Sequence, residues 1–306
     1  MNTPVSRPAM PRAFRHLRLA ALLAAAALAL CLQPARAAQT AAPTAAPTAV
    51  QPGQAAAPQP GQQRMQPEAA FALMAGEAEK GNGQAMLTLG QFYEQGVGVP
   101  RNFGKALEWY RKAAQAGQAE GHYNVGVCYE VGMGTAPDAG KALESFRKAA
   151  DMGLTLAMSK LSGMYISGNG VGRDTAKGVL WLNKAADAGL APAFVELGAI
   201  HLSGLLGQKK DEKKALELFT KAADLGNLEA VRNIAVIYRD GLGVKADPAR
   251  AYTWFLIAHK GGYAGEDIAR ALGLLEGSLS AAQAEQARKE ADAWLEAYAK
   301  RRQSGE

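Results

Sequence analysis

The chain has 306 residues, 48% of them hydrophobic, which is enough to form a sizeable buried core. These values exclude a short disulfide-stapled scaffold and a wholly disordered chain. The formal net charge is +6, from 34 Lys and Arg against 28 Asp and Glu, but residues 1–37 carry five of the arginines and no acidic residue. Without them the balance is 29 against 28, so the remaining chain lacks the basic excess that nucleic-acid binding requires.

Residues 1–37 have the layout of a bacterial signal peptide. Four arginines precede an apolar run at 19–32, which is shorter than the roughly 20 residues that a membrane span needs. An A-x-A site follows, so we expect cleavage after Ala37 and a periplasmic or secreted protein without a stable membrane anchor. Lipidation at Cys31 is disfavoured because the bulky Leu30 stands where a lipobox usually has Gly or Ala. The alternatives are an apolar run retained as an anchor helix and a cytosolic protein with an uncleaved N-terminus.

Residues 38–67 are predicted to be a disordered tether. They consist mainly of Ala, Pro, Thr, Gln and Gly, contain no aromatic residue, and carry one charge, at Arg64. A segment of this composition cannot bury enough apolar surface to offset the entropy lost on ordering. We therefore expect it to hold the folded part of the chain away from its neighbours.

A tandem repeat follows the tether. The triplet Lys-Ala-Ala begins at Lys112, Lys148, Lys184 and Lys221, at steps of 36, 36 and 37 residues, and a glycine follows each copy at the same distance. The extra residue of the fourth unit falls in the loop at 205–208. Five complete units result, at 82–117, 118–153, 154–189, 190–226 and 227–262.

Each unit contains two predicted helices. The first has small or apolar residues on one face, as at Ala85, Leu89 and Tyr93 in the first unit. A glycine-containing turn ends this helix, and an Asn or Asp then occupies the N-cap position of the second helix. The predicted N-cap residues are Asn102, Asp138, Asp174, Asp211 and Asp247.

Short helices with one apolar stripe each cannot bury that stripe alone, so each pair must stack on the next. The sequence therefore predicts an all-α fold, a right-handed α/α superhelical solenoid of helix-turn-helix repeats. A half repeat at 68–81 precedes the five units. Capping helices at 263–300 follow them, and Ser280 and Gln283 form a capping box that opens the last helix.

One unit shows the recurring motif in full: Ala85-(x3)-Leu89-Gly90-(x2)-Tyr93, Gly96-Val97-Gly98-Val99, Lys105-Ala106, Trp109 and Lys112-Ala113-Ala114-(x2)-Gly117. This motif resembles the Sel1-like repeat family, relatives of tetratricopeptide repeats, over about residues 68–300. Ser145 and Leu218 depart from it by replacing the tryptophan. The resemblance implies a protein-interaction scaffold, often periplasmic or surface-associated in bacteria, without chemistry of its own. Because some exported members are linked to penicillin binding and β-lactam hydrolysis, a β-lactam or cell-wall enzyme is the alternative.

The sequence predicts no catalytic, cofactor-binding or metal-binding residues. Ser145 and Lys148 match the S-x-x-K nucleophile pattern of β-lactam enzymes, but both occupy ordinary repeat positions and no S-D-N or K-T-G motif accompanies them. His122, His201 and His259 fall at three different repeat positions, which does not favour a shared metal ion.

Cys128 is the only cysteine outside the predicted leader, so no intramolecular disulfide is expected in the mature protein. The equivalent residues of the other units are all apolar, which predicts a buried and unreactive thiol. These equivalents are Phe92, Met164, Ile200 and Ile237.

A partner-binding groove is predicted on the first helices, at positions that vary between units while their neighbours stay constant. By analogy with related superhelices, such positions line the concave surface, and Tyr and Arg among them are residue types that dominate binding hot spots. The favoured function is an exported, non-catalytic scaffold for an unidentified protein or peptide, in envelope or secretion processes. The predicted groove residues are Tyr123, Asn124, Glu130, Lys160, Glu196, Arg232, Asn233 and Arg239.

Overall fold

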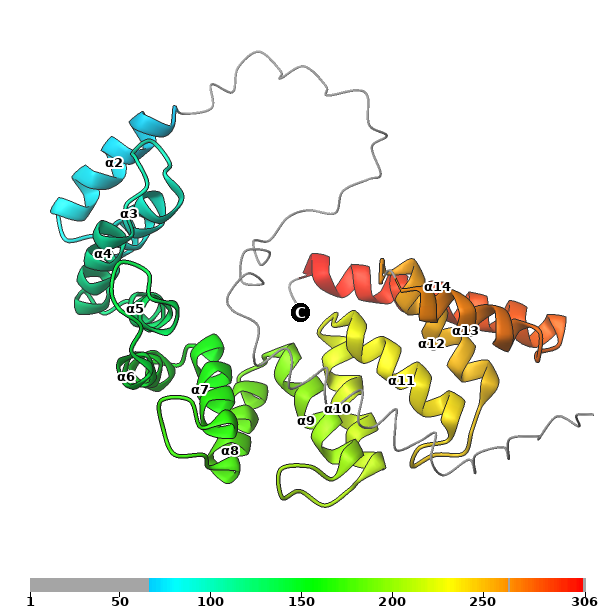
Figure 1. Cartoon of the computed structure of the whole chain (residues 1–306). Coiled ribbons are helices and arrows are strands. Elements are labelled where there is room, and N and C mark those ends of the chain that lie inside the picture. Colours follow the sequence, from blue (N-terminus) through cyan, green and yellow to red (C-terminus); the bar gives the residue numbers. More distant parts are fainter. Residues whose placement is uncertain (1–65, 264, 305–306) are drawn as a thin grey trace, which may run out of the picture. The chain divides into compact units, whose positions relative to one another are not determined.

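The computed structural model describes residues 66–263 and 265–304, and every regular element within them is a helix (Figure 1). The all-α prediction is therefore confirmed. The predicted leader and all but the last two residues of the predicted tether lie outside the described residues. The described chain divides into two compact units, which we call the N-terminal unit (66–172) and the C-terminal unit (173–304).

The N-terminal unit begins with the predicted half repeat and continues through consecutive helix pairs. Each helix packs on its neighbours in the chain, as a stacked repeat requires. Its helices are α2 (Pro67–Glu79), α3 (Gly83–Gln95), α4 (Phe103–Gln115), α5 (Ala119–Val131), α6 (Ala139–Asp151) and α7 (Thr155–Ser167).

The C-terminal unit continues the pattern and ends in two helices of a different kind. The last helix packs on α12 as well as following α13 in the chain, so it covers the end of the repeat. Its helices are α8 (Thr175–Asp187), α9 (Ala191–Ser203), α10 (Glu212–Asp224), α11 (Leu228–Asp240), α12 (Pro248–Lys260), α13 (Glu266–Glu276) and α14 (Ala281–Ser304).

Helix ends follow the predicted local chemistry in both units. The carboxylate or amide oxygen of each predicted N-cap residue accepts a hydrogen bond at 2.9 or 3.0 Å from the backbone N–H three residues later, on Lys105, Lys141, Lys177, Lys214 or Arg250. Caps of this kind typically contribute about 1 kcal/mol each. All five predicted N-caps are confirmed.

Pairs of helices approach closely where a glycine of the first helix faces an aromatic ring of the second. A Cβ atom on Gly126 of α5 would lie 2.8 Å from the ring of Phe146 on α6. In the C-terminal unit, a Cβ atom on Gly198 would lie 2.7 Å from the ring of Phe219. Both rings are completely buried, so glycine is required for the ring to fit. A third pair of this kind is Gly90 and Tyr110.

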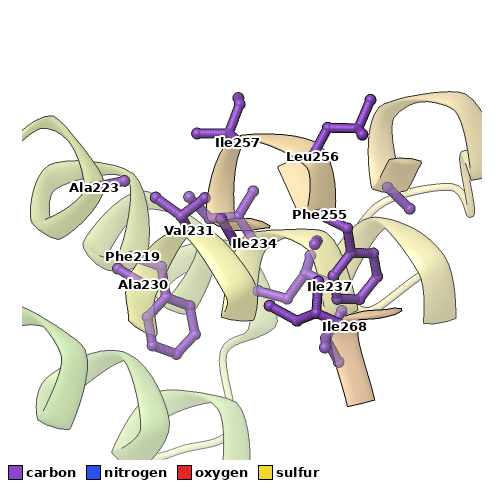
Figure 2. Close-up of a cluster of buried hydrophobic side chains, with 14 of the residues drawn as sticks. Phe219, Ala223, Ala230, Val231, Ile234, Ile237, Phe255, Leu256, Ile257 and Ile268 are labelled. Atoms are coloured by element: carbon purple, nitrogen blue, oxygen red, sulfur yellow. The ribbon is translucent and has the colours of Figure 1, made fainter. Parts of the chain in front are cut away.

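The end of the C-terminal unit is closed by a large apolar cluster. Side chains from α10, α11, α12 and α13 converge there, and Figure 2 shows Ile234 and Ile237 of α11 near Phe255 of α12 and Ile268 of α13. Helix α14 adds Ala284, Ala287 and Ala291 to the same cluster. Helices α13 and α14 lie in the region where the capping helices are predicted, and α14 extends to Ser304.

The capping box at the start of α14 is also confirmed. The Ser280 hydroxyl accepts from the backbone N–H of Gln283 at 3.3 Å, and the Gln283 side chain accepts from the backbone N–H of Ser280 at 3.0 Å. Farther along the helix, the ring of Trp294 lies 5.9 Å from that of Trp254 and stacks on Tyr298 at 5.4 Å. The contact between Trp254 and Trp294 holds α14 against α12.

In the described part of the chain, no helix combines the length and apolar character that crossing a membrane would need.

Candidate partner-binding surfaces

Ser145 and Lys148 do not form a nucleophile and base pair in the structure. The Ser145 hydroxyl donates to the backbone carbonyl of Lys141 at 2.8 Å, and Ser145 is only 9% exposed. The Lys148 ammonium instead pairs with Glu144 at 2.8 Å. A serine nucleophile needs a base within hydrogen-bond reach, and each of these groups is engaged elsewhere.

Cys128 lies in the N-terminal unit with 1% of its surface exposed, as predicted. Burial, aided by the negative charge of Glu94, raises the pKa of its thiol to about 12. The thiolate is the nucleophilic form of cysteine, so a buried thiol with this pKa is inert near neutral pH.

The three histidines do not share a site, and the described residues contain no group of three or more His, Cys, Asp or Glu side chains that could hold a metal ion. Burial, followed by the nearby charge of Lys148, lowers the pKa of His122. The Nδ1 atom of His201 is buried, whereas His259 is exposed.

Three of the predicted groove residues come together in the N-terminal unit. The Lys160 ammonium of α7 pairs with the Glu130 carboxylate of α5 at 2.7 Å, and both side chains are 22% exposed. The same ammonium lies 5.8 Å from the ring centroid of Phe146, and the ring of Tyr123 lies 5.4 Å from that ring. We call Tyr123, Glu130, Phe146 and Lys160 the aromatic–ion cluster. Asn124 is half-buried beside Tyr123 on α5.

The aromatic–ion cluster spans two consecutive repeats and presents several polar groups. Burial, and then the negative charge of Glu130, raise the pKa of the Tyr123 hydroxyl, so this group remains a protonated donor at neutral pH. An ammonium group has three donors, and Glu130 is the acceptor seen for one of those of Lys160. The cluster therefore offers an aromatic surface, hydrogen-bond donors and a carboxylate within one half-buried area.

The predicted groove residues of the C-terminal unit form a different arrangement. Arg232 of α11 donates to the Asp267 carboxylate of α13 at 2.9 and 3.2 Å, and to the side-chain oxygen of Asn233 at 3.3 Å. Arg239 pairs with the adjacent Asp240 at 2.7 and 2.9 Å, and these hydrogen bonds raise the pKa of its guanidinium. We call these five residues the arginine cluster.

The two remaining predicted residues of the C-terminal unit differ in burial. Asn233 is only 3% exposed, so it offers almost no area to a partner. Glu196 is half-buried on α9, one repeat before the arginine cluster. The predicted groove residues therefore fall into separate local groups within their units.

One contact between an arginine and a tyrosine, which the sequence pattern did not lead us to predict, recurs in the N-terminal unit. Arg111 donates to the hydroxyl of Tyr129 at 2.7 Å, and Arg147 donates to the hydroxyl of Tyr165 at 2.7 Å, so each arginine of a second helix reaches a tyrosine of the next repeat. Both pairs have the same separation of 18 residues, and that shared spacing is the signal from which they could have been predicted.

These features define a class of protein, an α/α repeat protein in which residues of consecutive helices form local polar and aromatic clusters. The Sel1 repeat family model matches residues 83–118, 119–154, 155–190, 193–227 and 228–263, which together make up more than half of the chain. The chain belongs to the Sel1 repeat family. The predicted units begin within a few residues of the matched ones.

Solved structures with similar folds include three bacterial proteins. A Sel1 repeat protein from Oxalobacter formigenes is 30% identical, with a TM-score of 0.58, and the match covers 65% of this chain and 81% of that one. The protective antigen c5321 of uropathogenic Escherichia coli, which has the same repeat fold, is 24% identical with a TM-score of 0.46, over 78% of this chain and 59% of that one. The immunity protein Pa5087 of Pseudomonas aeruginosa is 20% identical with a TM-score of 0.40, over 94% and 85%. No curated protein matches the chain.

Proposed function

We propose that this protein is an exported, non-catalytic scaffold that binds a partner protein through the first helices of its repeats, in envelope or secretion processes. The observation that carries this proposal is the aromatic–ion cluster of the N-terminal unit. It places a tyrosine, a lysine and a carboxylate from two consecutive repeats in one half-buried area. Binding hot spots are typically aromatic or charged groups that a partner can cover completely.

The arginine cluster supports a different role within the same scaffold. Arg232 and Arg239 each have an aspartate partner within the chain, and Asp267 lies on the capping helix α13. An arginine satisfied in this way costs energy to expose to a new partner, because its existing hydrogen bonds must be replaced. We assign this cluster to holding the cap on the last repeat, and partner recognition to the N-terminal unit.

Site-specific photocrosslinking in intact cells tests the proposal. A benzoylphenylalanine at position 124, beside Tyr123, should crosslink a partner protein. The same probe in place of the exposed Glu108, on the second helix α4, should not. The Tyr123→Ala substitution should reduce the crosslink at position 124 by about tenfold or more, as expected for a hot-spot residue.

A matched control is available on the same helix. Tyr129 is also half-buried on α5 but contacts Arg111 outside the cluster, so Tyr129→Ala should leave the crosslink at position 124 intact. Equal crosslinking by the Tyr123→Ala variant would refute the hot-spot role of Tyr123, and a probe at position 124 that captures no partner in the unchanged protein would place partner recognition on another face.

The non-catalytic part of the proposal has its own test. The mature protein and its Ser145→Ala variant would be compared on a chromogenic β-lactam. We expect no turnover by either protein, since Ser145 and Lys148 are engaged with Lys141 and Glu144. Turnover that disappears in the variant would replace the scaffold with an enzyme. Mass spectrometry of the mature N-terminus tests export: a chain that starts at Ala38 supports it, and a retained Met1 refutes it.

A further inference from the structure

The turn between α9 and α10, residues 204–211, differs from the other turns within repeats. In the regular turns, the second glycine sits directly against the start of the preceding repeat's second helix, so a side chain there would clash. In this longer turn Leu206, with a φ of 54°, stands two residues after Gly204, as the second glycine of a regular turn does, and the additional Gly207 has open space around it. The regular contacts are Gly98 with Pro67, Gly134 with Phe103, Gly170 with Ala139 and Gly243 with Glu212.

This longer turn contains two leucines where the regular turns have at most one. Leu205 is 37% exposed, and Leu206 is the only non-glycine residue with a positive φ, 54°, among the described residues. Backbone hydrogen bonds hold the turn in shape, from Leu205 to Ile200 at 3.1 Å and from Gln208 to Leu205 at 3.0 Å. The turn is therefore held by backbone hydrogen bonds, and it exposes part of the Leu205 side chain to solvent.

Four lysines follow these leucines within the next eight residues of the chain. Lys209, Lys210, Lys213 and Lys214 are all exposed. The nearby acidic groups are already used, since Asp211 caps α10 and Glu212 pairs with Lys210 at 2.7 Å. Lys213 is specific to this turn, because the other second helices have Gly or Ala at the equivalent position, namely Gly104, Gly140, Ala176 and Ala249.

We propose that the turn at 204–211 is a docking site for an acidic peptide segment that carries an apolar side chain. This inference rests on the protein-binding function proposed above and places a second contact on the C-terminal unit. The apolar residue of the peptide covers Leu205, and its carboxylates pair with Lys209 and Lys213. Binding of this kind depends on charge complementarity and weakens as salt increases.

A peptide fits this surface better than a lipid bilayer does. Two leucines bury little apolar area in a membrane, and stable membrane binding needs a larger apolar face. The turn's fixed backbone suits the recognition of one short segment, since a preorganised loop loses little entropy on binding.

Selection from a random peptide library displayed on phage tests this inference. The full chain would be the bait, and a triple variant, Leu205→Ser, Lys209→Glu and Lys213→Glu, would remove peptides that bind elsewhere. We expect the enriched peptides to combine Asp or Glu with an adjacent large apolar residue. In fluorescence anisotropy, their affinity should fall about tenfold or more in the triple variant, a change that corresponds to about 1.4 kcal/mol.

Lys245→Glu provides the matched control, because Lys245 is the equivalent of Lys209 in the regular turn of the fifth repeat and is also exposed. It should leave the affinity unchanged. Circular dichroism should show that the triple variant remains helical. The inference is overturned if no acidic peptide is enriched, or if the triple variant binds the selected peptides as well as the unchanged protein. Binding to phosphatidylglycerol vesicles in place of peptides also overturns it.

The two proposals fail separately. If Tyr123→Ala abolishes crosslinking in cells and the triple variant changes neither crosslinking nor peptide binding, only the docking turn is refuted. If crosslinking at position 124 survives Tyr123→Ala while the selected peptides still require the turn, the recognition role of the aromatic–ion cluster is refuted instead.

Discussion

The aromatic–ion cluster and the arginine cluster occupy equivalent repeat positions but form different surfaces. Tyr123 and Glu130 of the N-terminal unit correspond to Arg232 and Arg239 of the C-terminal unit. In the first cluster, Glu130 pairs with a lysine of the next repeat above a buried aromatic ring. In the second, the arginines pair with aspartates on the capping helix or beside them in sequence. The repeat thus determines the positions of these side chains. The residue type at each position determines whether the surface is available to a partner or stabilises the contact between neighbouring helices.

The largest expected effect on stability comes from a substitution that displaces Phe146, the buried ring of the aromatic–ion cluster. Gly126→Ala places a Cβ atom 2.8 Å from the buried Phe146 ring, so we expect the N-terminal unit to lose about 2–3 kcal/mol of stability in urea unfolding. Phe146→Leu should restore part of this loss in the double variant. The smaller side chain makes room for the methyl group, as in the third repeat, which has Ser162 and Leu182 at the two positions.

Gly140→Ala is the control for this substitution. Gly140 lies in the first turn of α6, and its added methyl group meets only the Asp138 side chain, at 3.5 Å. Since alanine favours helix over glycine, this variant should be as stable as the unchanged protein or slightly more so. Equal stability of the Gly126→Ala variant would show that the helices can separate and that the ring does not set their spacing.

The ion pairs of the two clusters should differ in their contribution to stability. Lys160→Met removes one partly exposed pair and should cost less than about 1 kcal/mol. Arg232→Met should cost about 1–2 kcal/mol, because it also removes the donor of the buried Asn233 oxygen and releases Asp267 on α13. Urea unfolding at low and high salt measures both. A larger loss of stability for Lys160→Met than for Arg232→Met would reverse the two assignments, of partner binding to the aromatic–ion cluster and of structural stabilisation to the arginine cluster.

The helix caps should behave alike in the two units, in contrast to the clusters. Asp138 and Asp247 accept the same hydrogen bond at 3.0 Å, three residues ahead. Alanine at either position should cost about 1 kcal/mol in urea unfolding. The corresponding asparagine variants should lose less, because the amide oxygen still accepts the bond. If the losses of stability at the two sites differ by well over 1 kcal/mol, the equivalent caps do not contribute equally in the two units.

These caps show which parts of the structure could be predicted from sequence. A helix end depends on a few neighbouring residues, so Asp138, Gly132 and the Ser280 capping box could be recognised without knowledge of tertiary contacts. The fold followed for a related reason, since an apolar stripe repeated five times has few ways to be buried other than stacking.

The candidate sites could be predicted only in part. The variation between repeats pointed to Tyr123, Glu130 and Lys160, but it did not point to Phe146, because a buried aromatic residue in an apolar position looks like any other core residue. Asn124 and Asn233 occupy equivalent positions, yet the first is half-buried and the second is 3% exposed. Burial depends on what neighbouring helices place over a residue, and a comparison of repeat positions does not contain that information.

The reactivity of Cys128 in the native protein should show the smallest effect of these predictions. It also gives the most direct way to follow the unfolding of one unit independently of the other. Since the folded pKa of about 12 lies above the ordinary 9.0, the native thiol should not react measurably with a disulfide reagent near pH 8. Between pH 9 and about 12 the unfolded chain releases this proton before the folded one, so the thiol's contribution to stability is complete below that range and declines as pH rises through it. In a chain without Cys31, through cleavage of the predicted leader or a Cys31→Ser substitution, labelling therefore reports opening of the N-terminal unit.

The same thiol can be combined with Gly126→Ala to test whether the units open independently. Trp181, Trp254 and Trp294 lie in the C-terminal unit, so with Trp109 replaced by Phe their fluorescence reports that unit alone. We expect Gly126→Ala to accelerate Cys128 labelling in dilute urea while the tryptophan transition keeps its midpoint. In a repeat protein, each repeat is stabilised only by its own contacts and by those with its neighbours. A steric clash between α5 and α6 therefore lowers the free energy of local opening near those helices first. If the midpoint of the tryptophan transition shifts while the rate of Cys128 labelling rises, the packing at Gly126 is energetically coupled to the C-terminal unit.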